Sequence, residues 1–147
     1  MPRRYPTRPF VGVGVVVFRD DRVLLVRRGK APGLHGWSIP GGAQEIDETV
    51  RETAHRELFE ETGLTVTLLG LVDVVDSITR DNDGRVLYHY TLVDFAARWQ
   101  AGEPEAGDDV AEAVWAALDD LARFDLWAET LRIIGLAEAL RGGPAEG

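Results

Sequence analysis

Short runs of β-branched, aliphatic and aromatic residues alternate along this chain with turn signals rich in Gly, Pro and Asp. Such runs are typical of β-strands, and the polar breaks between them are typical of hairpin turns and loops. Asp20 and Asp21 mark one turn, and the segment 81–84 (Asp-Asn-Asp-Gly) marks a stronger one. The pattern predicts strands over 11–18, 23–26, 37–39, 66–78 (as one strand or two), 86–99 and 113–117.

Two segments instead show the period of an α-helix. Val50, Ala54 and Leu58 recur at i, i+4 and i+8, which predicts a helix from about 48 to 62 with this stripe facing the core. Asp47 is the expected N-cap, and Gly63 suits the position after the last turn. A short helical turn is expected from Asp119, followed by a C-terminal amphipathic helix marked by Trp127, Leu131, Ile134 and Leu140.

Strands and helices are mixed in order, so we expect an α/β fold in a single domain. A length of 147 residues is enough for one sizeable core. We expect an extended, basic and Pro-rich arm over 1–9, the folded domain over 10–141, and a frayed tail over 142–147.

The last turns of the first helix carry an unusual charge pattern. Glu57, Glu60 and Glu61 lie at i, i+3 and i+4, so their Cβ atoms are about 5–6 Å apart on one face. Like charges repel there, and the negative end of the helix dipole favours Lys or Arg instead. A hard divalent cation takes oxygen ligands and would account for the pattern. Arg56 is placed to brace the acidic face, with Glu52 and Glu60 four residues to either side.

Composition limits the kinds of ligand and the cellular location that we expect. The formal net charge is −9, which argues against general nucleic-acid binding because that requires a basic surface. A small anionic substrate remains compatible if metal ions and a few arginines meet it. There is no Cys, no long apolar run and no signal-peptide pattern, which fits a cytoplasmic protein without a membrane partner.

The glutamates belong to a longer spacing. Gly42 is followed at fixed intervals by Glu48, by Arg56-Glu57-Leu58, by Glu60-Glu61 and by Gly63-Leu64. The segment 42–64 thus resembles the signature of the Nudix hydrolase family at every defined position, although Asp47 stands where many members have Gly. The resemblance extends from about 10 to 140. It implies an α/β/α sandwich with a mixed sheet, and hydrolysis of a nucleoside diphosphate linked to another group with Mg²⁺ or Mn²⁺.

The resemblance also implies roles for the site residues. Glu57 and Glu61 are the first expected metal ligands and Glu60 the next, with Gly41 of the preceding turn counted beside them. Glu48 and Glu45 are weaker candidates for an additional ion. Arg56 orients the cluster by ion pairing. The catalytic set expected by resemblance is Arg56, Glu57, Glu60 and Asp109.

The general base is left open between a glutamate of the signature and an acid of a later loop, namely Glu105, Asp108, Asp109 or Glu112. Asp109 is placed ahead of Glu112, because its position six residues before Trp115 resembles that of a metal-binding acid in MutT-type members.

Several further polar and aromatic residues have either a structural or a functional interpretation. Arg28, by resemblance to a phosphate-contacting position, and Arg27 are candidates for substrate binding, as is Glu112. Gly12-Val13-Gly14 is interpreted as an ordinary strand, because a dinucleotide fingerprint needs a Gly where Val17 stands. The core is the expected place for Trp37, Trp115 and Trp127.

The signature indicates the bond that is broken more firmly than the substrate. Weaker similarity around 27–33, 88–95 and 106–121 is to small ADP-ribose pyrophosphatases, so ADP-ribose or a related sugar nucleotide is the first expectation. A MutT-like enzyme acting on oxidised or non-standard nucleoside triphosphates is the alternative. A non-catalytic nucleotide-binding regulatory module ranks third. Many relatives dimerise, and the Arg-rich arm suggests a homodimer contact.

Overall fold

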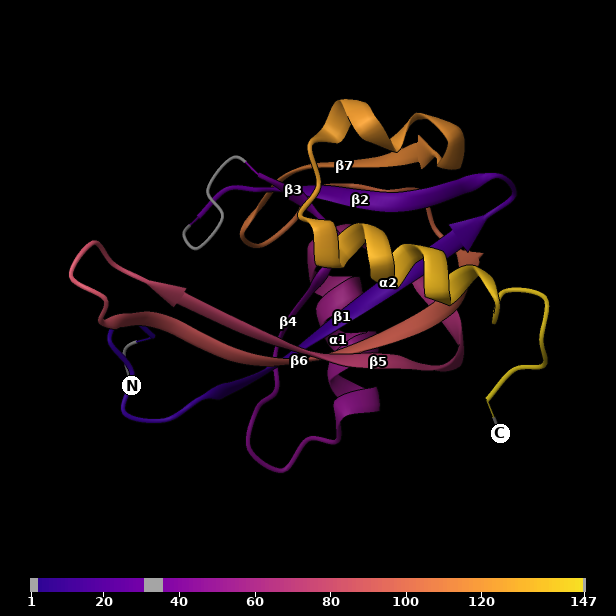
Figure 1. Ribbon diagram of the computed structural model, residues 1–147. Helices are drawn as coiled ribbons and strands as arrows, with labels where there is room; N and C mark the ends of the chain where they lie inside the picture. The colour runs from indigo at the N-terminus through magenta and orange to yellow at the C-terminus, as the bar shows by residue number, and fades with distance from the viewer. Residues whose placement is uncertain (1–2, 31–35, 147) are drawn as a thin grey trace.

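The computed structural model describes residues 3–30 and 36–146. Figure 1 shows a sheet with one helix in front of its central strand and one behind. In chain order the elements are β1 (Phe10–Arg19), β2 (Arg22–Arg28), β3 (Trp37–Ser38), β4 (Gly41–Ala43), α1 (Val50–Thr62), β5 (Thr65–Arg80), β6 (Val86–Ala101), β7 (Val110–Ala117), the 3-10 helix η1 (Leu118–Phe124) and α2 (Ala128–Glu138).

The sheet is mixed, as expected. Its main path runs β3-β2-β1-β6-β5, with β4 added beside β1 and β7 beside β2. Strands β1 and β6 are parallel, whereas β1–β2, β1–β4, β2–β3, β2–β7 and β5–β6 are antiparallel. The connection from β1 to its parallel neighbour β6 contains the first helix and the long strand β5, which is how a chain returns to run in the same direction.

Two strands, β2 and β4, pair with different parts of the same edge of β1. At its end, β1 pairs with β2 through Phe18 with Val23 and Arg19 with Arg22. At its beginning, residues 12–14 of β1 pair instead with β4. Strand β2 therefore diverges from β1, and the segment 36–43 enters the opening between them.

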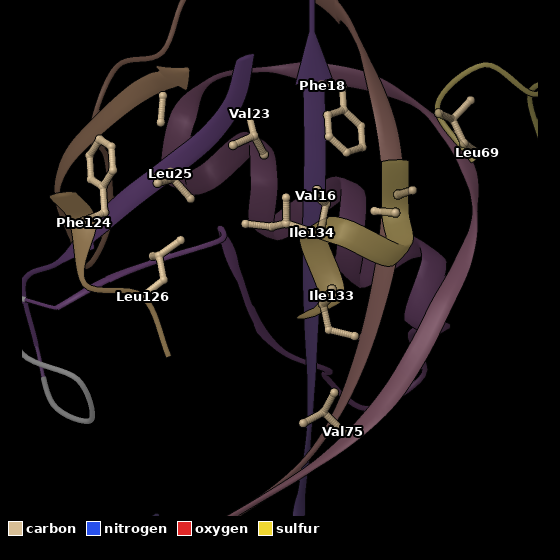
Figure 2. Packing of buried hydrophobic residues seen from close by; sticks show 13 residues of the cluster. Val16, Phe18, Val23, Leu25, Leu69, Val75, Phe124, Leu126, Ile133 and Ile134 are labelled. Carbon is tan, nitrogen blue, oxygen red and sulfur yellow. The ribbon is translucent and has the colours of Figure 1, made fainter. Parts of the chain in front are cut away.

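The two helices cover opposite faces of the sheet, because side chains alternate along β1. Val13, Val15 and Val17 pack in one cluster with Ala54 and Leu58 of α1. On the other face, Val16 and Phe18 pack with Ile133, Ile134 and Ala137 of α2, as Figure 2 shows for most of that cluster. The predicted α/β/α sandwich, with Ala54 and Leu58 facing the core, is confirmed.

Helix α1 begins later than predicted. The N-cap is Thr49 and not Asp47: the Thr49 hydroxyl accepts a hydrogen bond from the Glu52 N–H, and the Glu52 carboxylate accepts one from the Thr49 N–H. This reciprocal pair satisfies two backbone donors, which a lone Asp cap would not. Asp47 lies in the turn before the helix with φ of 68°. At the other end, Gly63 ends the helix in the left-handed conformation, as expected.

The C-terminal helix follows the predicted stripe only in part: Ile134 is buried and Leu140 packs against the core cluster, as expected. Ile133, Ile134 and Ala137 are buried, whereas Trp127 is 49% and Leu131 43% exposed. Trp127 directly precedes the first turn of α2, so its direction is not set by the helical period. The prediction that Trp127 belongs to the core is therefore wrong. Trp37 and Trp115 do pack against the two buried clusters.

Both ends of the described chain contact the domain. The Tyr5 N–H donates to the Leu87 carbonyl at 2.9 Å, and the Tyr5 hydroxyl donates to the Asp81 carboxylate at 2.8 Å. At the other end, the Glu146 N–H donates to the Leu68 carbonyl at 2.9 Å, and its carboxylate binds Arg51. The arm thus contacts the β5–β6 hairpin of its own chain, and Glu146 of the tail contacts β5 and α1. Residues 1, 2 and 147 of the predicted arm and tail are outside the described ranges.

Two strands late in the chain can be compared with the prediction. The segment predicted as one strand or two is a single strand, β5, which agrees with the first alternative and is interrupted by register shifts against β6. Strand β7 differs from the prediction, because it begins at Val110 and not at residue 113. None of the helices within residues 3–30 and 36–146 has the length and apolar character needed to cross a membrane.

Candidate functional site

A cleft of about 840 Å³ opens where β2 diverges from β1. One wall is acidic and includes Glu57 and Glu61 of α1 and the loop residues Asp108 and Asp109. Elsewhere it is lined by the sheet face of β5 and β6, by the start of α2 and by the N-terminal arm; the lining residues there include Arg3, Arg4, Val75, Ser77, Tyr88, Tyr90, Leu92, Asp94, Trp127, Glu129 and Thr130. The segment 36–45 crosses between the two parts.

Three carboxylates converge on the acidic wall. Glu57, Glu60 and Asp108 each offer one oxygen, and these oxygens lie within 4.8 Å of one another. Burial raises the pKa of Glu57, and the nearby Glu60 and Asp108 charges add to that effect. Gly42 permits the close approach, since a side chain there would overlap the Glu57 carboxylate. Three hard oxygen donors at this spacing fit a divalent cation such as Mg²⁺ or Mn²⁺.

Asp108 reaches this cluster because its loop is attached to the end of α1. The Gly107 N–H donates to the Glu61 carbonyl at 2.9 Å, and the Glu105 N–H donates to the Thr62 carbonyl at 3.0 Å. These bonds satisfy carbonyls that a helix end leaves without partners. Asp109, which the sequence analysis ranked ahead of Glu112 as the loop acid, instead pairs with Lys30, with 2.7 Å between carboxylate and ammonium. Sequence spacing alone could not order these adjacent acids; the preceding Gly107 is the local signal for Asp108.

Glu61 has a different environment from Glu57 and Glu60, the other two glutamates on this helix face. It is 3% exposed, and its carboxylate accepts hydrogen bonds from Arg28 at 2.6 Å and from the Gly41 N–H at 2.9 Å. Burial raises the pKa of Glu61, while Arg28 and the Gly41 amide oppose the rise. Gly41 therefore contributes an amide donor to Glu61. Arg28 lines the cleft but is already bound to a protein carboxylate.

Arg56 holds the acidic face together. Its guanidinium contacts the carboxylates of Glu48 at 2.6 Å, Glu57 at 2.7 Å and Glu60 at 3.1 Å. It also donates to the Ala43 carbonyl at 3.0 Å, which ties α1 to β4. Hydrogen bonds from Arg56 and then Thr53 lower the pKa of Glu48 to about 2. The expected bracing is present, but Glu52 does not take part in it because Glu52 closes the capping box.

Of the remaining residues that the sequence proposed for the site, some line the cleft and others do not. Glu45 lies 3.7 Å from Arg56 and lines the cleft. Arg27 and Glu112 form an ion pair of 3.0 Å between β2 and β7, and neither is among the cleft-lining residues. The structure therefore brings Arg28 to the cleft and leaves Arg27 and Glu112 beside it. Part of the loop after β2, residues 31–35, lies outside the described ranges.

Several cleft residues had no motif to identify them. Tyr88, Tyr90 and Asp94 alternate along β6, so they share the face that lines the cleft. Trp127 joins them from the start of α2 with about half of its surface exposed. An exposed Trp beside an apolar and acidic floor can contact a flat aromatic ligand group. In the sequence, the alternation along β6 indicates that these residues share one face of the sheet. It does not indicate which other elements of the chain face them across the cleft.

Comparison with known proteins gives a consistent result. A family model described as NUDIX domain matches residues 8–135. An ADP-ribose pyrophosphatase from Methanocaldococcus jannaschii is 36% identical over 116 residues, covering 79% of this chain and 66% of that protein. A CTP pyrophosphohydrolase from Escherichia coli is 30% identical, covering 91% of this chain and 96% of that protein.

The fold is shared with solved structures. The chain resembles a MutT NUDIX hydrolase from Burkholderia pseudomallei with a TM-score of 0.76 and 32% identity, covering 88% of this chain and 98% of that one. The chain spans about half the length of two other curated relatives, at 49% and 50%.

Proposed function

The chain belongs to the Nudix family, and from this premise we propose that it hydrolyses the pyrophosphate bond of a nucleotide derivative with the help of Mg²⁺ or Mn²⁺. The observation that carries the proposal is the convergence of Glu57, Glu60 and Asp108, of which Glu57 and Asp108 line one wall of the cleft. Their oxygens are the ligand type that these ions prefer. When bound, such an ion neutralises phosphate charge and makes a water molecule more acidic.

The residues around the cluster support it in distinct ways. Arg56 contacts Glu48, Glu57 and Glu60 together, so it limits the repulsion among the acids and orients them. Glu61 is held in place by Arg28 and by the Gly41 amide and remains a candidate ligand on the same helix face. Asp109 lines the cleft beside Lys30 and remains our candidate for the general base that accepts a proton from the attacking water.

For the substrate, we propose ADP-ribose or a related sugar nucleotide, cleaved to a nucleoside monophosphate and a sugar phosphate. The support is the similarity to the M. jannaschii enzyme, whose name states that activity. The second candidate is a nucleoside triphosphate cleaved to monophosphate and pyrophosphate. It is supported by the E. coli enzyme, which this chain covers almost completely.

The test is a panel of ADP-ribose, other nucleoside diphosphate sugars and nucleoside triphosphates, scored by the identity of the products with Mg²⁺ and with Mn²⁺. Release of a nucleoside monophosphate and a sugar phosphate supports the first proposal. Turnover confined to triphosphates supports the second. Glu57→Gln serves as the inactive control, because it removes one charge from the three-carboxylate cluster with little change in shape. Nucleotide binding without hydrolysis under every condition would favour a regulatory module and overturn both enzymatic proposals.

A further inference from the structure

Asp94 is a buried carboxyl group that the proposed chemistry does not use. It lies on β6 and is 5% exposed, yet it is among the residues that line the cleft. It is not part of the cluster formed by Glu57, Glu60 and Asp108. Much of the surface around it is apolar, including Val75, Leu92 and Ile133, which pack in or against the core cluster on that face.

Gly12 and Gly14 explain how a carboxyl group fits at this position. Gly14 is paired with Asp94 across the parallel strands. A Cβ atom on Gly14 would overlap an Asp94 carboxylate oxygen, and one on Gly12 would press against Leu92. The two glycines, which the sequence suggested were ordinary strand residues, therefore leave a hollow in the floor of the cleft, and Asp94 occupies part of it.

A carboxyl group in this setting is costly for the free protein. Burial raises the pKa of Asp94 to about 6, and the Gly14 backbone amide only partly opposes the rise. Asp73 raises the pKa further and Arg132 lowers it, but these two form their own ion pair of 3.0 Å. Asp94 accepts a hydrogen bond from the Gly14 amide and is only slightly exposed to the cleft, so a bound ligand that supplies a further donor would offset part of the cost of burying the carboxylate.

We propose that Asp94 is a specificity-determining residue that accepts a hydrogen bond from a donor group on the nucleoside half of the substrate. This inference rests on the proposed function and names what the sheet side of the cleft recognises. A phosphate would be repelled by the carboxylate, whereas a nucleobase amino group or a ribose hydroxyl can donate to it. A ligand that lacks the donor leaves Asp94 unsatisfied in a buried site, which is the arrangement that discriminates most strongly between similar substrates.

The experiment measures binding of nucleoside 5′-monophosphates by calorimetry without divalent ions, so that it does not depend on hydrolysis. Amino and keto bases are compared as adenosine with inosine monophosphate and cytidine with uridine monophosphate. Ribose is compared with 2′-deoxyribose in the adenosine compound. We expect the wild type to bind the ligand with the recognised donor about tenfold more tightly than its partner. The pair that shows the difference, and its direction, identify the donor: tighter binding of the adenosine or cytidine compound indicates the exocyclic amino group, tighter binding of the inosine or uridine compound indicates the ring N–H, and tighter binding of the ribose compound indicates the 2′-hydroxyl.

Asp94→Asn keeps the size and shape of the side chain but replaces one acceptor oxygen with a donor, so we expect this difference to shrink to less than about twofold or to reverse. Asp76→Asn is the matched control: Asp76 is an exposed aspartate on β5 that is not among the cleft-lining residues, and its variant should keep the wild-type ratio. Equal wild-type affinity within every pair, absence of binding by all five compounds, or a wild-type ratio in a folded Asp94→Asn protein would overturn the proposal. A retained binding preference in a protein that hydrolyses nothing would overturn the proposed function alone.

Discussion

Arg28 at the end of β2 donates a hydrogen bond of 2.6 Å to Glu61 in the last turn of α1. The contact connects β2, which borders the opening in the sheet, to helix α1. It also changes the interpretation of both residues, since the expected phosphate-binding arginine neutralises one of the expected metal ligands. Arg28 is further held by donating to the Ser38 hydroxyl and the Ile39 carbonyl, so its guanidinium has a defined position before any substrate arrives.

The Arg28–Glu61 pair should therefore contribute to stability when no metal ion is present. Arg28→Ala leaves a carboxylate buried without its partner, and we expect it to lower the free energy of unfolding by about 2–4 kcal/mol. Urea denaturation in a chelator measures this loss. Adding Glu61→Gln to Arg28→Ala should recover part of it, because the uncompensated charge is then gone. Equal losses in the single and double variants would contradict the coupling.

Adjacent acids in the loop before β7 should have separable effects. Asp108→Asn removes an oxygen from the three-carboxylate cluster, so we expect Mg²⁺ affinity to fall by roughly 10–100-fold. Asp109→Asn should lower kcat by about 100-fold or more with little change in Mg²⁺ affinity, as for loss of a general base. Metal titrations and steady-state rates measure both effects, with Asp83→Asn of the exposed hairpin turn as control. Near-normal turnover by Asp109→Asn would move the base to the helix.

Arg56 should give the fold a specific dependence on pH. The pKa of Glu48 is lowered to about 2, so the stabilising contribution of its pair with Arg56 is fully present above pH 4.5 and is lost as the pH falls through about 2. Arg56→Ala should therefore be less stable than the wild type above pH 4.5, and the difference should diminish in stronger acid. Urea midpoints measured across this range test the prediction. Arg56→Lys should recover only part of the loss, because an ammonium cannot reproduce the fork of a guanidinium.

Arg123→Ala is a suitable control for that series, since Arg123 forms one exposed ion pair with Asp120. Pairs of this kind contribute about 0.5 kcal/mol or less. A difference between Arg56→Ala and the wild type that stayed constant from pH 7 to pH 2 would show that lost packing, and not the ion pairs, is responsible.

Asp94 should affect stability with a pH dependence opposite to that of Glu48. Its pKa is about 6 in the folded protein against 3.8 as the ordinary value, so the unfolded chain releases the proton first and stability falls as the pH rises from about 4 through 6. Asp94→Asn should therefore be more stable than the wild type at pH 7, by about 3 kcal/mol, with the gain shrinking towards pH 4. Thermal unfolding at several pH values measures this, beside Asp76→Asn. A gain that did not depend on pH would contradict the linkage.

Local patterns were sufficient for much of the fold. The strands around 11–18 and 86–99 and the helix ending at Gly63 follow from periodicity and from cap chemistry, which depend on neighbours in the chain. The Thr49 cap was missed because Thr49-x-x-Glu52 and Asp47 are both reasonable helix starts in sequence. Trp127 was misplaced because a residue just before a helix is not bound by the helical period.

The sequence by itself determined the acidic helix face, its brace at Arg56 and the family resemblance, since all of these reside in one continuous segment with a fixed spacing. Only the tertiary structure decided which distant groups meet that face. Asp108 joins it by loop bonds to the end of α1, Arg28 reaches Glu61 across the opening beside β1, and Asp94 enters the floor where Gly14 lacks a side chain. These contacts join residues that are far apart in the sequence and depend on how the strands pair. The local spacing of residues therefore cannot predict them.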